Sequence, residues 1–118
     1  MNNTTIIKLN DYLTLNSGVT PEEGTPVYNS IIEAFKKGEA VTLDFEGVDM
    51  LTTAFLNVVI GDLYKDYSSE KLKSMLILVN YTEPTAKRIK KVTDNAKLFY
   101  KDESAYTKEV EEVLNGTN

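Results

Sequence analysis

The chain has 118 residues, of which 42% are hydrophobic and 26% are charged, and its formal net charge is −5 at pH 7. This length and composition predict one globular domain with a single core, without a membrane span or a secretion signal, and we expect a cytoplasmic protein. The sequence contains no histidine and no cysteine, which excludes imidazole bases, thiolate nucleophiles, disulfides and the usual zinc sites. These absences close most familiar enzyme mechanisms to this chain, while its carboxylates and hydroxyls still suit oxygen-ligated Mg²⁺ or Ca²⁺, or plain binding. We expect a protein that is not an enzyme and carries no cofactor.

The first third of the chain predicts a strand, a loop and a helix. Thr4 to Leu9 is β-prone, Tyr12 to Leu15 could add a second short strand, and the polar residues that follow predict a loop. Pro26 suits the first position of a helix. Apolar residues then recur at helical spacing until the two lysines and the glycine at 36–38, which are typical of a helix end.

The middle third predicts a second strand and a second helix. Ala40 to Phe45 alternates between apolar and polar residues, which predicts a strand with one apolar face. Glu46 to Asp49 predicts a turn, and the helix at 52–67 carries a broad apolar stripe. Gly61 costs this helix about 1 kcal/mol relative to alanine, which predicts a close approach to a neighbouring strand.

The last third predicts another strand and a long helix. Ser68 to Lys73 is a charged connector with a helical turn, and the five apolar residues at 75–79 predict a strand that is covered on both faces in the middle of a sheet. Thr82 is suited to cap a helix at about 83–100, and 104–114 predicts a short terminal helix. The inward-facing residues of the long helix are predicted to be Ala86, Ile89, Val92, Thr93, Ala96 and Phe99. The alternation of strands and helices predicts a layered α/β domain.

Several motifs resemble a known family. DFEGV at 44–48, TAFLN at 53–57, ILVN at 77–80 and the helix end NAKLFY at 95–100 are similar to STAS-like bacterial domains of unknown function. These are related to the STAS domains of anti-sigma-factor antagonists and sulfate transporters. The resemblance covers 40–100, and it implies a small single-domain layered α/β fold. In that fold, helices pack mainly on one face of a mixed sheet of about four strands.

In anti-sigma-factor antagonists, an Asp-Ser-Ser-Gly element at the start of the corresponding helix carries the phosphoacceptor serine. Thr52 aligns with the Asp and Thr53 with that serine, while Ala54 and Phe55 replace the second Ser and the Gly. The resemblance implies a non-enzymatic regulatory module that docks a protein partner around this helix start. In the antagonists, the partner is a kinase-like ATPase that also phosphorylates the module. Thr53 is then the candidate phosphoacceptor, and Asn57, in the family-typical Phe-Leu-Asn pattern, is a further candidate for partner binding.

The two threonines also have a purely structural explanation. Thr52 would cap the helix by accepting a hydrogen bond from an amide two or three residues further on, which is worth about 1 kcal/mol. A phosphoryl group on Thr53 would instead add about −1.5 to −2 charges at a helix start, a place that tolerates negative charge. Both explanations remain open at the level of the sequence.

Two charged clusters offer other readings. Asp44, Glu46 and Asp49 could hold a hard cation, or act as acid and base, in a small-molecule or divalent-cation-binding sensor or enzyme; a polar turn would show the same residues. The other cluster is basic and could hold an anion or an acidic partner, or could be a solvated helix face. It consists of Lys87, Arg88, Lys90 and Lys91.

The acidic excess lies in the first two-thirds of the chain. Up to Thr82 there are six basic residues against eleven acidic ones, whereas seven of each follow from Glu83 onward. Such an acidic body argues against binding to nucleic acid, because affinity for phosphates grows with the number of cations that the protein presents. The acidic charge is also compatible with another function, that of an inhibitor that presents an acidic face to a nucleic-acid-binding protein.

Overall fold

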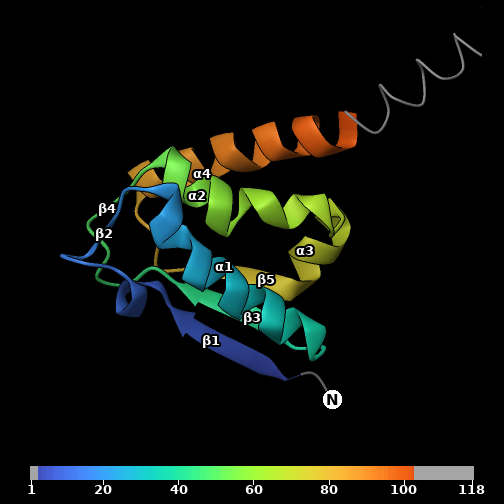
Figure 1. Cartoon of the computed structure of the whole chain (residues 1–118), viewed down its shortest axis with the longest axis horizontal. Helices are drawn as coiled ribbons and strands as arrows, with labels where there is room; N and C mark the ends of the chain where they lie inside the picture. Colours follow the sequence, from blue (N-terminus) through green and yellow to red (C-terminus); the bar gives the residue numbers. More distant parts are fainter. Residues whose placement is uncertain (1–2, 103–118) are drawn as a thin grey trace, which may run out of the picture.

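The computed structural model describes residues 3–102, in which strands and helices alternate (Figure 1). The strands are β1 (Thr4–Lys8), β2 (Ser17–Gly18), β3 (Ala40–Asp44), β4 (Met50–Leu51) and β5 (Leu76–Val79). The α-helices are α1 (Pro21–Lys36), α2 (Thr53–Val59), α3 (Ser69–Met75) and α4 (Glu83–Ala96). Two 3-10 turns, η1 (Leu9–Tyr12) and η2 (Gly61–Lys65), and a π-helical turn, η3 (Lys97–Asp102), complete the described part. The terminal helix predicted at 104–114 lies outside the described residues.

The strands form two parallel sheets instead of the expected mixed sheet of about four strands. β3 lies at the centre of a three-stranded sheet with the order β1-β3-β5, and β2 pairs with β4 separately. The pairings are parallel because helical crossovers connect the paired strands, and a crossover of this kind returns the chain in the same direction. The second strand, expected at 12–15, lies at Ser17–Gly18. The apolar run at 75–79 forms an edge strand instead of the expected central one.

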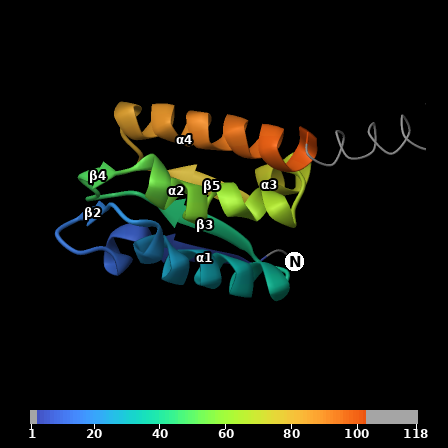
Figure 2. The same cartoon turned by 45° about the horizontal axis from the view of Figure 1, so that its top comes forward.

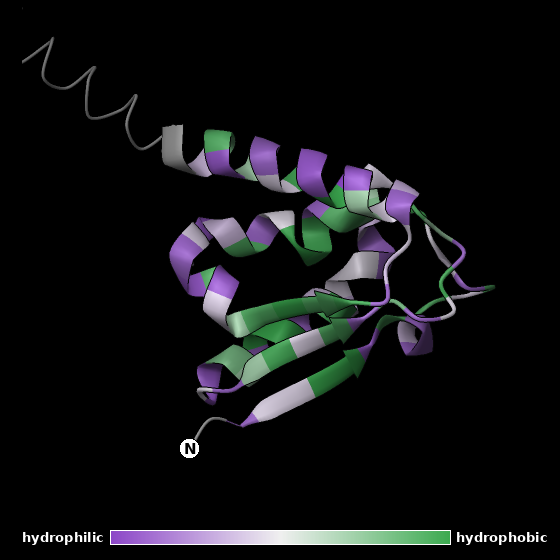
Figure 3. Ribbon diagram, turned by 180° about the vertical axis from the view of Figure 1, so that it is seen from behind, coloured by the Kyte–Doolittle hydropathy of each residue, from purple (hydrophilic) through white to green (hydrophobic). Residues whose placement is uncertain are grey.

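Helices cover one face of the three-stranded sheet, and the other face is open, as seen from behind in Figure 3. Ile7 and Leu43 are paired in register on the covered side, where both are buried. On the open side, Ile6 and Ile77 flank Thr42 in register and are 66% and 44% exposed. The core therefore lies between the sheet and the helices, as expected for a two-layer α/β arrangement.

Helix α1 begins five residues earlier than Pro26, where the sequence predicted its start. The Thr20 hydroxyl accepts a hydrogen bond from the Glu23 N–H (3.3 Å), and the Glu23 carboxylate accepts one from the Thr20 N–H (2.8 Å). This capping box, with Pro21 at the first helical position, starts the helix and leaves Pro26 inside it. Gly24 in the first turns is buried against α2, whose Val59 Cγ2 lies 3.0 Å from where a Cβ of residue 24 would be.

The predicted helix at 52–67 is divided into α2 and η2. Gly61 starts η2 and faces α4 instead of the predicted strand, since the nearest atom to a Cβ at this position would be Val92 Cγ1, at 3.4 Å. Helix α4 follows the predicted cap, because the Thr82 hydroxyl accepts a hydrogen bond from the Thr85 N–H (3.4 Å). Its inward face holds Ile89, Val92 and Ala96 as expected, but Phe99 is exposed because it lies beyond the end of α4, in η3.

Candidate functional site

The start of α2 lies at the end of the molecule where the parallel strands finish. Because β1, β3 and β5 point the same way, their carboxyl ends meet at one edge, and α1, α2 and α4 begin beside it (Figures 1 and 2). A threonine caps each of these three helices: Thr20, Thr52 and Thr82. We call this end the carboxyl edge and define it as residues 9–23, 44–53 and 80–83. In open parallel sheets, ligands bind outside the carboxyl ends of the strands.

Thr52 is occupied by structural contacts. Its hydroxyl accepts the predicted capping hydrogen bond from the Phe55 N–H (3.1 Å) and donates to the Val19 carbonyl (2.6 Å). Its own N–H donates to the Gly18 carbonyl (3.0 Å). Thr52 therefore joins the start of α2 to the segment that follows β2, and its hydroxyl has little capacity left for a partner.

Thr53, unlike Thr52, is not engaged in structural contacts within the described part of the chain. It is the first residue of α2, its side chain is exposed, and within residues 3–102 its hydroxyl makes no hydrogen bond. Asn57, one helical turn later, is also exposed and lines a hollow of about 360 Å³ between α2 and the end of α4 with η3. Of the two threonines, Thr53 is the one whose oxygen is accessible to another molecule.

Three apolar side chains are exposed on the segments that form or flank the β2–β4 pair, which leads into α2. In the β2–β4 pair, Gly18 and Leu51 face inward onto Phe55, so alternation turns Met50, and Val19 beyond the strand end, outward. Val19 is 48% exposed and Met50 is 47% exposed. Leu15, in the turn before β2, is 87% exposed. We call the surface formed by Leu15, Val19, Met50 and Thr53 the lip.

Leu15 is displayed by an unusual backbone conformation. Leu15 and Asn16 have φ angles of 54° and 60°, and the Ser17 N–H donates to the Thr14 carbonyl (3.2 Å) to close the turn. The left-handed region is unfavourable for a bulky side chain such as leucine and costs it about 1–2 kcal/mol. The turn is held from the other side, because the Asp49 N–H donates to the Asn16 carbonyl (2.7 Å).

The acidic candidates do not form a cation site. An Asp44 carboxylate oxygen accepts hydrogen bonds from the Asn80 side-chain amide (3.0 Å) and the Glu46 N–H (2.9 Å), and these bonds, followed by the charge of Lys8, hold the pKa of Asp44 below its ordinary value. Among residues 3–102, no three acidic side chains are placed to hold a metal ion. Asp44 therefore joins β3 to the end of β5, and Glu46 and Asp49 are exposed beside it.

The basic candidates lie along α4. Lys87, Lys90 and Lys91 are exposed and Arg88 is half-buried. Lys90 pairs with Asp94 across one helical turn, with 2.9 Å between its Nζ and the carboxylate oxygen. Both partners are exposed, so the pair contributes little to stability. This surface agrees with a solvated helix face, and it adds no geometry that points to a bound anion.

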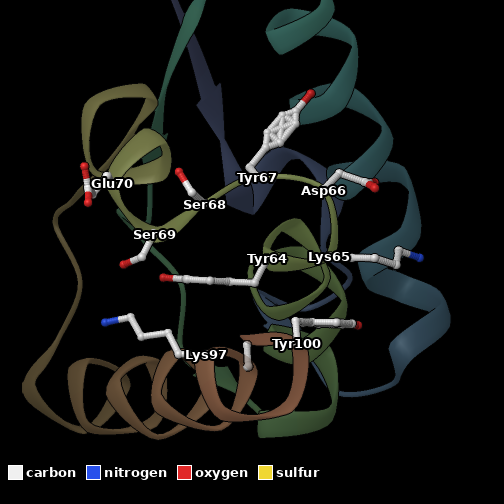
Figure 4. A pocket seen from close by; sticks show the side chains of 10 residues that line it. Tyr64, Lys65, Asp66, Tyr67, Ser68, Ser69, Glu70, Lys97 and Tyr100 are labelled. Atoms are coloured by element: carbon white, nitrogen blue, oxygen red, sulfur yellow. The ribbon is translucent and has the colours of Figure 1, made fainter. Parts of the chain in front are cut away.

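A pocket at the opposite end of the molecule was not expected from the sequence. It has a volume of about 630 Å³ and lies between the segment 64–70 and the end of α4 with η3 (Figure 4). Tyr64 points into it, and burial, followed by the charge of Asp94, raises the pKa of this tyrosine. The Tyr100 hydroxyl donates to Asp62 at its border (3.3 Å). Its lining combines polar residues of two distant segments, and no motif in either segment signals such a pocket.

Comparison with known proteins identifies the family. The family model described as a STAS-like domain of unknown function (DUF4325) matches residues 23–86, more than half of the chain. The chain therefore belongs to this family of STAS-like domains. The match begins in α1, earlier than the resemblance at 40–100, and contains β3, α2, β5 and the carboxyl edge from Glu23 onward. No curated protein and no solved structure matches the chain. Within residues 3–102, no helix has the length and apolar character needed to cross a membrane.

Proposed function

We propose that this chain is a non-enzymatic, cytosolic regulatory module that docks a protein partner at the lip. The observation that carries the proposal is the exposure of Leu15, Val19 and Met50 beside the accessible hydroxyl of Thr53. Apolar side chains that several neighbouring segments leave exposed at one end of a molecule are typical of protein interaction sites. The lip occupies the carboxyl edge, and the side chains behind it, Leu51 and Phe55, are fully buried and hold it in place.

We propose Thr53 as the position that controls docking. Thr52 is committed to its cap, whereas Thr53 occupies the position that aligns with the phosphoacceptor of the anti-sigma-factor antagonists. In those proteins a kinase-like ATPase is both the partner and the kinase, and the proposed partner here is of the same kind. A phosphoryl group would add about −1.5 to −2 charges next to the three apolar side chains and would change the energy of docking.

Affinity capture with matched variants tests the proposal. The tagged full-length chain is incubated with an extract of its native cells, in parallel with Leu15→Asn, Leu98→Asn and Thr53→Glu. Asparagine adopts the left-handed conformation readily, so Leu15→Asn removes the apolar side chain and keeps the turn. Leu98 is also an exposed leucine, but it lies in η3, which follows the end of α4, whereas the carboxyl edge lies at the start of that helix.

The proposal expects a partner that is captured by the wild type and by Leu98→Asn and is lost with Leu15→Asn. If both leucine variants recover the same proteins in the same amounts as the wild type, the lip is not a docking surface. If Thr53→Glu recovers every partner equally, Thr53 has no part in the mechanism, whatever happens at Leu15.

A further inference from the structure

The charges around the lip limit the kind of partner that can dock there. The carboxyl edge carries seven carboxylates and, within its bounds, no lysine or arginine; Lys8, the register partner of Asp44 at the end of β1, lies at its border. The seven are Asp11, Glu22, Glu23, Asp44, Glu46, Asp49 and Glu83. Since the net charge of the whole chain is −5, this one edge holds more negative charge than the entire molecule shows. The first cations along the neighbouring elements are Lys8 on β1 and Lys87 in the second turn of α4.

Some of these carboxylates lie close to the segments that carry the apolar side chains. Asp49 precedes Met50 in the chain, and its N–H holds the turn that carries Leu15. The Glu23 carboxylate accepts a hydrogen bond from the Val19 N–H (3.1 Å), and Glu22 lies beside Glu23 in the first turn of α1. Asp49, Glu46 and Glu22 are exposed, so their charges face any molecule that approaches. An acidic protein, a nucleic acid or an anionic membrane would meet like charges here, whereas a basic surface would meet opposite ones.

The strained turn supplies a second reason to expect an apolar contact. Leucine is an expensive residue for a left-handed position, and glycine or asparagine would close the same turn at lower cost. The Leu15 side chain is nevertheless 87% exposed and packs little against the rest of the chain. A contact with another molecule would bury it.

We infer that the lip docks a basic surface of a partner protein, whose own apolar side chains cover Leu15, Val19 and Met50. This inference rests on the proposed function and adds the chemistry of the partner. The contact combines a small apolar centre with a charged rim. The rim steers the encounter and the centre supplies the burial.

Defined peptides test the inference without knowledge of the natural partner. The simplest basic surface with an apolar face is an amphipathic helical peptide built from leucine and lysine. Two controls keep the leucines and replace every lysine with glutamate or with serine. The full-length chain, labelled with ¹⁵N, is titrated with each peptide, and the amide shifts of residues 15–19 and 49–53 report binding at the lip. Leu15→Asn and Leu98→Asn are titrated alongside, and vesicles of phosphatidylcholine and phosphatidylglycerol provide a membrane probe.

The inference expects the leucine–lysine peptide to shift the amides of the lip and the glutamate peptide to leave them unchanged. Leu15→Asn is expected to weaken this binding about tenfold or more, because a buried leucine is lost, while Leu98→Asn leaves it unchanged. Raising the salt concentration is expected to weaken binding of the wild type.

Three results would overturn the inference. If the glutamate or serine peptide binds at the lip as tightly as the lysine peptide, docking there does not select a basic partner, although the lip remains a docking surface. If the lysine peptide shifts amides elsewhere or none at all, the lip does not recognise a basic surface, and the capture experiment decides the proposed function separately. If the vesicles shift the same amides, the lip is a membrane contact.

Discussion

At the scale of single residues, two adjacent threonines have different roles. The Thr52 hydroxyl caps α2 and bonds to the Val19 carbonyl, and so it fixes the distance between the helix and the β2 segment. Thr53 contributes neither a cap nor a buried contact. A residue that contributes little to folding can be modified without unfolding the chain, which is what a control position requires.

Replacing each threonine with alanine separates these roles. Thr52→Ala is expected to lower the free energy of unfolding by about 1–2 kcal/mol, because the cap and the bond to Val19 are both lost. Thr53→Ala is the matched control and is expected to stay within about 0.5 kcal/mol of the wild type, since its side chain is exposed. Urea denaturation measures the free energy of unfolding of both variants. Equal stabilities of the two variants would mean that the cap is not a significant contribution.

At the scale of elements, the position of the lip depends on how closely α1 approaches α2. Gly24 of α1 lies against α2, where a Cβ would be 3.0 Å from Val59 Cγ2 and 3.1 Å from the Phe55 carbonyl oxygen. Phe55 also contacts Gly18 of β2, where a Cβ would lie 2.7 Å from its ring. Glycines on two elements thus allow Phe55 to be fully buried beneath the lip.

A second pair of variants tests this close packing. Gly24→Ala improves helix propensity by about 1 kcal/mol, but its methyl group would lie only 3.0 Å from Val59 Cγ2 and 3.1 Å from the Phe55 carbonyl oxygen, which is backbone and cannot turn away. We expect a net loss of about 1 kcal/mol or more in the free energy of unfolding. Gly61→Ala is the control, since its methyl group would meet Val92 at 3.4 Å, an ordinary contact. Its stability is expected to be unchanged or raised by up to about 1 kcal/mol. A Gly24→Ala variant as stable as Gly61→Ala in urea would exclude the tight contact.

The elements that the sequence predicts well are those with a strong local signal. The strand at 40–45 alternates cleanly, and Thr82 caps a helix with a regular apolar stripe; both are present. Pro26 suits a first helical position, but the capping box at Thr20 and Glu23 is the signal that starts α1 five residues earlier. Strands β2 and β4 have only two residues each, too few for a periodic pattern, and their pairing depends on contacts distant in the sequence.

The candidate site was predictable only in part. The motif at 53–57 placed it at the start of α2, and Thr53 is exposed there. The exposure of Leu15 and Val19 was not predictable, because the pairing of β2 with β4 brings them to α2 from more than thirty residues away in the sequence. The role of Asp44 was not predictable either, because its hydrogen bond to Asn80 joins the ends of two strands that are distant in the sequence.

At the scale of the whole molecule, acidic charge is concentrated at the carboxyl edge. Seven carboxylates lie there with Lys8 of β1 at the border, whereas the other basic residues within 3–102 lie at the end of α1, in η2 and α3, and along α4 and η3. An approaching basic protein would be oriented by this asymmetry before any contact forms. A negative charge added at Thr53 would then extend the acidic rim, and it would strengthen docking of a basic surface.

This expectation fixes the direction in which Thr53 acts. Thr53→Glu is expected to bind the leucine–lysine peptide up to about fivefold more tightly than the wild type, because an exposed charge pair is worth at most about 1 kcal/mol. Thr53→Gln has nearly the same size without the charge and is expected to bind like the wild type. The gain should vanish at about 1 M salt, where the screening length falls to about 3 Å. Isothermal titration calorimetry measures the affinity of the peptide for the wild type, Thr53→Glu and Thr53→Gln. A Thr53→Glu variant that binds the peptide more weakly than Thr53→Gln at low salt would show that position 53 is covered on docking, and that phosphorylation would release a partner instead of recruiting it.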